Sequence, residues 1–359
     1  MNTRIATILA QEDLTAAGTK TIEINLRDII SRMTIILRTT NVAEIMGAHP
    51  AANITKIELV DGSDVLFSLN GHQAQAVNFY QRDKKPYNYI DNIAGHVHTA
   101  VFGLDFGRFL YDPMLAFDPN KFINPQLKIT WDEDLCQAGT LVNTCEVRAH
   151  IFDELVPTPT GFFMTKEIYS YLVQTTGYEY IDLPTDFITQ QIYVKCLLSL
   201  YTFCSFLDEF RLSEDNDRRV PVDMTVSEFL RETLEQWGYV IEHAYLNGID
   251  HEEYFFCMPS DIGYALQSPY MDNDTSTIWS SDGGTFTYKG TSTNVNHKAI
   301  VYGALPHAVM PLLPKPRNEI VDWYDVTKLG SLKLRIKDGA HSADVATAEV
   351  ITTQYRTYA

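Results

Sequence analysis

The strongest constraint on the fold of this chain is a period-two alternation of apolar and polar residues, which occurs near the middle of the sequence and again at its end. Residues 125–132 alternate in this way, and residues 144–152 continue the pattern. Residues 332–338 and 347–350 repeat both stretches at the C-terminus. Because successive side chains of a β-strand point to opposite faces, the pattern predicts strands with one buried and one solvated face. A pair of strands that closes the first half and then the whole chain predicts one β-module used twice.

The two halves also align with each other at a regular spacing. Four pairs of positions carry the alignment, three at an offset of 157 residues and the last at 205: Ile24 with Ile181, Tyr80 with Trp237, Val97 with Tyr254, and Leu127 with Leu332. A single insertion of roughly 48 residues in the second half explains the change of offset. We expect this insertion to be a long loop in the polar stretch 268–297.

Composition limits the classes of function open to this chain. Its 359 residues suffice for about two domains, and a hydrophobic share of 45% supports a sizeable core. The formal net charge of −18 would repel a phosphate backbone, so we predict no direct, sequence-specific nucleic-acid binding. The five cysteines show no CxxC spacing, which favours reduced thiols in an intracellular compartment. We expect neither a secretory signal nor a membrane-spanning helix.

Changes of pattern along the chain predict its division into domains. Residues 1–20 have apolar residues at helical spacing and look like an N-terminal arm, and strand-like alternation begins at residue 21. The Pro- and Thr-rich stretch 157–161 marks a boundary. We therefore predict an arm at 1–20, a first module at 21–156, a linker at 157–177 and a second module at 178–359.

Local signals place one hairpin and two helices. The Asp-Gly dipeptide at 61–62 lies between two alternating runs and predicts a hairpin. Asn70 with Gln73, and Thr225 with Glu228, have the spacing of capping boxes and predict two helix N-termini. Each half therefore has about eight strands, with a short helix between the early and the late ones.

Three stretches resemble a known lineage of proteins: residues 60–71, 106–113 and 124–130, with the sequences VDGSDVLFSLNG, FGRFLYDP and NPQLKIT. Together with the order of strands and helices, they resemble the double jelly-roll major capsid proteins of tailless icosahedral viruses. This is the lineage of the adenovirus hexon and of membrane-containing phages. The resemblance is strongest to lipid-containing single-stranded-DNA phages of flavobacteria. It covers nearly the whole chain and includes no catalytic motif.

The resemblance implies an all-β fold of two consecutive eight-stranded antiparallel jelly rolls, each with a short flanking helix. It implies a structural protein without enzymatic activity, which assembles as pseudo-hexagonal homotrimers to build an icosahedral shell. Two rolls in each of three subunits would give six similar wedges. The implied partners are neighbouring capsomers, minor capsid or penton proteins, and an internal lipid membrane reached by the N-terminal arm. The implied location is the virion capsid, after assembly in the host cytoplasm.

Signals for a chemical site are weak in this sequence. His96 and His98 have the spacing of a cupin metal site, but only Asp105 follows them, and His150 would have to be the remote ligand. His251 lacks the second histidine of a zincin. We therefore predict no catalytic, cofactor-binding or metal-binding residue.

One acidic stretch resembles the start of a calcium loop. It begins at Asp272, but Thr277 stands where such a loop has glycine and Gly283 where it has glutamate. We interpret it as a solvated loop, and a weak calcium site between subunits stays open as an alternative.

A second class of tandem jelly roll is the main alternative for the whole chain. A bicupin-like metal enzyme or a carbohydrate-binding protein would need histidines and glutamates that converge inside one barrel, or an exposed aromatic platform. Duplicated cupins would also repeat the HxH motif, yet at the offset of 157 His96 and His98 align with Glu253 and Phe255.

Overall fold

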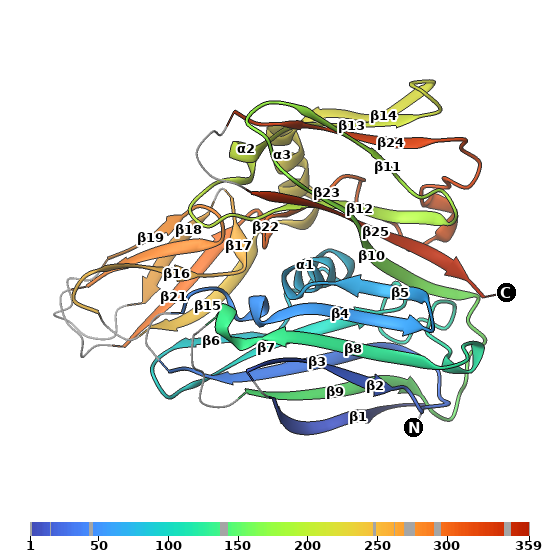
Figure 1. Ribbon diagram of the computed structural model, residues 1–359, viewed down its shortest axis with the longest axis horizontal. Helices are drawn as coiled ribbons and strands as arrows, with labels where there is room; N and C mark the ends of the chain where they lie inside the picture. The colour runs from blue at the N-terminus through green and yellow to red at the C-terminus, as the bar shows by residue number, and fades with distance from the viewer. Residues whose placement is uncertain are drawn as a thin grey trace.

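The structure is a computed structural model that describes residues 2–14, 16–42, 46–136, 143–246, 249–261, 263–268, 277–290, 296–340 and 346–358. The chain forms two β-sandwiches and a smaller β-rich insertion (Figure 1). In this view the first sandwich lies below the second, and the insertion extends to one side of their junction. Among the described residues, no helix has both the length and the apolar character needed to cross a bilayer.

The first sandwich packs the strands β1-β9-β3-β7-β6 of one sheet against the strands β2-β8-β4-β5 of another. Its strands are β1 (Thr3–Leu14), β2 (Ala17–Glu23), β3 (Ile30–Thr40), β4 (Ile54–Asp61), β5 (Asp64–Leu69), β6 (Asn88–Asn92), β7 (Val97–Asp105), β8 (Pro125–Asp132) and β9 (Asn143–Phe152). The alternating apolar residues of β8 and β9 are buried, as predicted from their pattern. These two strands lie on opposite sheets, so they face each other across the core and do not pair.

The second sandwich repeats the order of β1 to β5 and β7 to β9, without a counterpart of β6 among the described strands. Its sheets have the orders β10-β25-β12-β23 and β11-β24-β13-β14, which match β1-β9-β3-β7 and β2-β8-β4-β5. Its strands are β10 (Gly161–Leu172), β11 (Tyr178–Asp182), β12 (Ile188–Cys196), β13 (Leu207–Glu214), β14 (Arg219–Thr225), β23 (Val309–Pro311), β24 (Leu332–Asp338) and β25 (Thr347–Thr357). The predicted double jelly roll is confirmed, and the C-terminal strands β24 and β25 are the counterparts of β8 and β9.

A helix follows the fifth strand of each roll. These helices are α1 (Gly71–Arg82) and α3 (Val226–Trp237), and each begins with the predicted capping box. The remaining helices are short: η1 (Pro50–Asn53), η2 (Pro119–Lys121), η3 (Glu133–Leu135), α2 (Phe203–Phe206) and η4 (Ile320–Asp322). The predicted hairpin is formed by β4 and β5, and Gly62 has a φ of +61° at its turn, a left-handed conformation that glycine adopts without strain.

The insertion in the second roll is larger and more ordered than a loop. Its strands are β15 (Val240–Leu246), β16 (Glu252–Phe256), β17 (Pro259–Ser260), β18 (Tyr264–Ser268), β19 (Thr277–Ser281), β20 (Thr285–Lys289), β21 (His297–Gly303) and β22 (Leu305–Pro306). The predicted loop at 268–297 therefore contains the antiparallel pair β19 and β20. The predicted match of Val97 with Tyr254 is also wrong, because the counterpart of β7 is β23 and Tyr254 belongs to β16.

Two parallel strand pairings join the first roll to the second half of the chain, one to the second roll and one to the insertion. Strand β5 pairs with β10, and β6 pairs with β15, so each of the two large sheets continues from the first half of the chain into the second. The core of the first roll likewise extends past α1 to Tyr193, Val309 and Ile351 of the second half. Fully burying a large apolar side chain stabilises the fold by about 1.5–3 kcal/mol, so this shared core holds the rolls together.

The predicted arm and linker are both β-strands. Residues 3–14 form β1, which pairs with β9 and belongs to the first roll. Shifts of register between Thr7 and Leu9 and between Leu9 and Glu12 interrupt its alternation, and this produced the apparent helical spacing. Most of the predicted linker 157–177 is β10, which has a register shift between Glu167 and Tyr169.

Candidate functional site

Helix α1 lies at the junction of the two rolls, and polar side chains fix its N-terminus to the second roll. The Gln73 amide donates hydrogen bonds to Glu167 of β10 and Glu349 of β25, both at 2.6 Å. Lys195 of β12 forms an ion pair with Glu349 at 2.8 Å, and both side chains are largely buried. Burial raises the pKa of Glu167, and the neighbouring charge of Glu349 adds to this effect.

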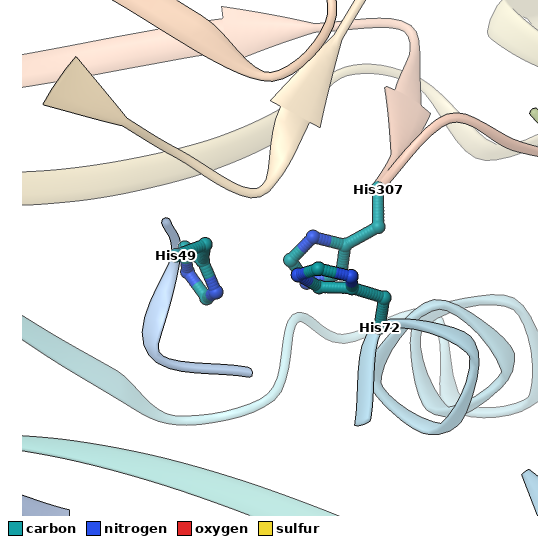
Figure 2. Close-up of side chains that lie close together, drawn as sticks. All are labelled: His49, His72 and His307. Carbon is teal, nitrogen blue, oxygen red and sulfur yellow. The ribbon is translucent and has the colours of Figure 1, made fainter. Parts of the chain in front are cut away.

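Three histidines from separate segments meet beside α1 (Figure 2). His49 immediately precedes η1, His72 lies in the first turn of α1, and His307 lies between β22 and β23. The ring centroids are 4.6 Å apart for His72 and His307, 4.7 Å for His49 and His307, and 6.2 Å for His49 and His72. Each ring offers a nitrogen within 4.8 Å of a nitrogen of the other two. We call these residues the histidine triad; they line a cavity of about 100 Å³.

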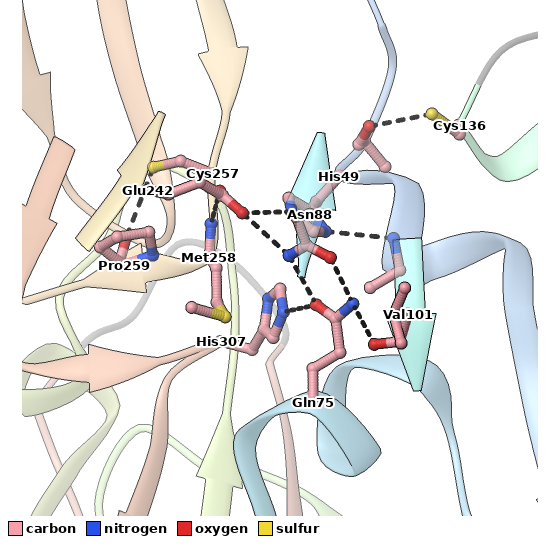
Figure 3. A network of polar contacts seen from close by, with 12 residues as sticks. His49, Gln75, Asn88, Val101, Cys136, Glu242, Cys257, Met258, Pro259 and His307 are labelled. Atoms are coloured by element: carbon pink, nitrogen blue, oxygen red, sulfur yellow. Dashed lines mark hydrogen bonds and ion pairs between the residues drawn. The ribbon is translucent and has the colours of Figure 1, made fainter. Parts of the chain in front are cut away.

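A buried carboxylate lies behind His49 (Figure 3). Glu242 of β15 is 3% exposed. It accepts hydrogen bonds from the Met258 N–H at 2.7 Å and the Asn88 amide at 2.9 Å, and its Oε1 lies 3.4 Å from Nε2 of His49. Burial opposes ionisation of Glu242, but His49 and the two donors outweigh it, so the pKa of Glu242 lies below its usual value. The site therefore contains a buried negative charge next to the histidine triad.

A second set of contacts orients His307. Its Nε2 lies 2.9 Å from Oε1 of Gln75, a residue of α1. The Gln75 amide nitrogen donates to Asn88 at 2.8 Å and to the Val101 carbonyl at 3.2 Å, so its oxygen is the acceptor that faces His307. His307 consequently carries its proton on Nε2 and a free lone pair on Nδ1.

Burial keeps the imidazole rings of His72 and His307 neutral. It lowers the pKa of His72 and of His307 well below the usual value, and the charge of Lys195 contributes in both cases. The buried Nε2 of His72 has no hydrogen-bond partner in the part of the chain that the structure describes. Neutral imidazoles with unused lone pairs are suited to metal coordination.

The histidines singled out from the sequence do not form a site. The side chain of His96 is 54% exposed and contacts Asp91 at 3.1 Å, whereas His98 is buried and contacts Asn41 at 2.7 Å. His150 lies 3.4 Å from the Tyr111 hydroxyl. The acidic stretch at 272–276 lies outside the described residues.

The histidine triad was not predicted. Its members are separated by 23 and 235 residues, and none belongs to a motif of fixed spacing. No local signal in the sequence could have found it, because only the packing of α1 between the rolls brings the three rings together.

The fold matches solved structures of viral capsid proteins along its whole length. The major capsid protein of Sulfolobus Turreted Icosahedral Virus is 11% identical with a TM-score of 0.60, over 100% of this chain and 98% of that one. The major capsid protein of bacteriophage PM2 is 11% identical with a TM-score of 0.54, and the match covers 99% of this chain and 98% of that one. The capsid structure of PBCV-1 is 11% identical with a TM-score of 0.56, and the match covers 99% of this chain and 94% of that one.

No protein-family model matches the chain, and no curated protein matches it either. At 11% identity the structural likeness shows the fold, which is that of the double jelly-roll capsid proteins of tailless icosahedral viruses. The predicted closeness to phages of flavobacteria stays a prediction.

Proposed function

We propose that this chain is a viral major capsid protein that assembles as pseudo-hexagonal homotrimers to build an icosahedral shell. The observation that supports this most is a double jelly roll aligned from end to end with capsid proteins of three different viruses. Two rolls of identical strand order, held side by side, present two similar edges per subunit. Three such subunits around one axis give a six-sided outline, which can tile a facet.

One segment carries exposed apolar side chains, which supports the proposal that this surface becomes buried between subunits. The segment between β7 and β8 carries Phe109, Leu110, Met114 and Ile123, which are 44% to 97% exposed. The same segment is anchored to the second half of the chain, because Arg108 donates to the Asn318 carbonyl at 2.6 Å. Apolar side chains grouped on an anchored segment are typical of interaction surfaces.

The proposal extends to partners and location. We propose that the chain contacts minor capsid or penton proteins and an internal membrane, and that it assembles in the host cytoplasm. Among the described strands, β1 is an edge strand that pairs only with β9, and we propose that its other edge contacts a neighbouring capsomer. This strand occupies most of the N-terminal arm that the sequence predicted at residues 1–20.

The bicupin-like alternative required histidines and carboxylates that converge inside one barrel. The histidine triad does converge, but at the junction between the rolls, around a cavity of about 100 Å³. We therefore propose no catalytic role for the chain.

The oligomeric state of the purified protein tests the proposal. Light scattering coupled to size-exclusion chromatography should give three times the chain mass of 40.8 kDa, and electron microscopy should show particles with a hexagonal outline. A stable monomer at micromolar concentration would contradict the proposed function.

A further inference from the structure

We propose that His49, His72 and His307 form a binding site for a divalent transition-metal ion, with zinc the best fit, which links the two jelly rolls. The proposal concerns the folded chain and does not depend on capsid assembly.

The spacing of the three rings fits a single ion. Tetrahedral zinc binds imidazole nitrogen at about 2.0–2.1 Å, which places the centroids of neighbouring rings about 5 Å apart. The three centroid separations, 4.6, 4.7 and 6.2 Å, lie around this value. One ligand atom of each residue already lies within 4.8 Å of those of the other two, and side-chain rotations would close the remaining distance around one ion. The adjoining cavity of about 100 Å³ has room for a water molecule as fourth ligand.

The hydrogen bonds around the triad leave a free lone pair on two of the three histidines, His72 and His307, and engage both nitrogens of His49. His307 donates from Nε2 to Gln75, which frees Nδ1. Nε2 of His72 is buried without a hydrogen-bond partner among the described residues. His49 accepts the Ala51 N–H on Nδ1 at 3.1 Å and therefore carries its proton on Nε2, towards Glu242. Metal binding to Nδ1 would exchange that one backbone hydrogen bond for a metal–nitrogen bond.

Charge gives an independent argument. Glu242 is a buried carboxylate whose contacts in the described structure come from Asn88, the Met258 N–H and His49. Burying a carboxylate is costly unless it is paired and hydrogen-bonded. A divalent ion on Nδ1 of His49 would place positive charge beside Glu242 through the imidazole, in the carboxylate–histidine–metal arrangement that is common around zinc.

The backbone at His307 also points to a special role. His307 and Ala308 have φ values of +49° and +52°, a left-handed conformation that costs residues with a Cβ about 1–2 kcal/mol each. The His307 N–H bonds the Met258 carbonyl at 2.7 Å, and the Ala308 N–H bonds Ser260 at 3.1 Å. This conformation directs the His307 ring towards His72, and such strained positions cluster at functional sites.

Binding of the metal by histidine nitrogens can be distinguished from binding by the thiol of a nearby cysteine. Cys257 lines the same cavity, with its thiol directed to the Pro259 carbonyl at 3.4 Å. The Cys257 thiol already has a backbone partner, and it is not among the three side chains whose ligand atoms cluster within 4.8 Å. We therefore expect the triad to bind the metal through nitrogen alone.

The test uses the untagged full chain, stripped with a chelator and dialysed against zinc. We expect about one tightly bound zinc per chain by elemental analysis, and X-ray absorption should show nitrogen or oxygen neighbours without sulfur. Cobalt in place of zinc should give the intense visible bands of a tetrahedral ion. Failure of the wild-type chain to take up zinc, or a sulfur neighbour, would overturn the proposal.

Variants locate the ion. His72→Gln and His307→Gln should abolish tight binding, and Glu242→Gln, which alters the support of His49, should weaken it by about 10–100-fold. His98→Gln removes another buried imidazole, one that contacts Asn41, and should leave binding unchanged. Binding that survives both triad variants, or is lost equally in His98→Gln, would place the ion elsewhere. If a triad variant does not fold, the absorption spectrum of the wild-type protein still decides the question.

Discussion

Asp261 shows how a single buried carboxylate can make the stability of this fold depend on pH. The residue is 2% exposed, has a left-handed φ of +51°, and accepts the Phe203 N–H at 2.6 Å. Burial raises the pKa of Asp261 to about 7. The folded protein therefore keeps a proton that the unfolded chain has released, and its stability falls as the pH rises from about 4 to about 7.

Replacing this carboxyl by an amide should remove the pH effect. Asp261→Asn keeps the acceptor for Phe203 and tolerates the left-handed backbone, but it cannot ionise. We expect the variant to be more stable relative to the wild type at pH 8 than at pH 5. The difference between the two pH values should be at most about 3 kcal/mol in the free energy of unfolding, measured by denaturant unfolding at each pH. Asp215→Asn is the control, because Asp215 has a φ of +47° and also accepts backbone N–H groups. Equal gains at both pH values for Asp261→Asn would contradict the prediction.

At the same scale, the candidate site was the least predictable part of the molecule. His96 and His98 stood out because their spacing is local, yet they lie in different environments. The triad histidines carry no such signal, since their proximity depends on how α1 packs between two rolls.

At the scale of elements, local chemistry was a better guide. Both helix starts were predictable, because a capping box needs only two side chains three residues apart. Strands β1 and β10 were not, because their register shifts interrupt the alternation on which strand prediction rests. Strand β23 has three residues, too few for a pattern, so the alignment of the halves selected β16 in its place.

The two caps should differ in energetic weight. Thr225→Ala removes an exposed cap from α3 and should cost about 1 kcal/mol. Asn70→Ala should cost more, because the Asn70 side chain both accepts from the Gln73 N–H at 3.0 Å and donates to Glu349 at 3.4 Å. Thermal or urea unfolding measures both, and the exposed Ser227 in the first turn of α3 provides the control Ser227→Ala. A smaller loss for Asn70→Ala than for Thr225→Ala would refute this ranking.

At the scale of the whole molecule, duplication was predictable because both halves keep the same order of hydrophobic patterns. The joint between the halves was not, since strand pairing between β5 and β10 or β6 and β15 leaves no mark on either sequence. The buried polar contacts of α1 belong to the same joint, and they can be tested directly.

Breaking the buried ion pair between Lys195 and Glu349 should weaken the whole chain. Lys195→Met leaves Glu349 buried without its cation, and we expect a loss of about 3–5 kcal/mol in the free energy of unfolding. Adding Glu349→Gln should restore part of it. The pair Lys328–Asp325 has a similar length of 2.7 Å but lies on the surface, so Lys328→Met should change little. Comparable losses for the buried and the surface pair would show that burial of Lys195 does not matter.

The continuity of the two large sheets has a mechanical consequence. Backbone hydrogen bonds hold neighbouring strands about 4.8 Å apart, so the angle between the halves is set within each chain and resists bending. The closed particle that we propose must nevertheless change direction at its edges and vertices. With a stiff subunit of this kind, that curvature would be absorbed where separate copies touch, and flat facets with sharp creases would result.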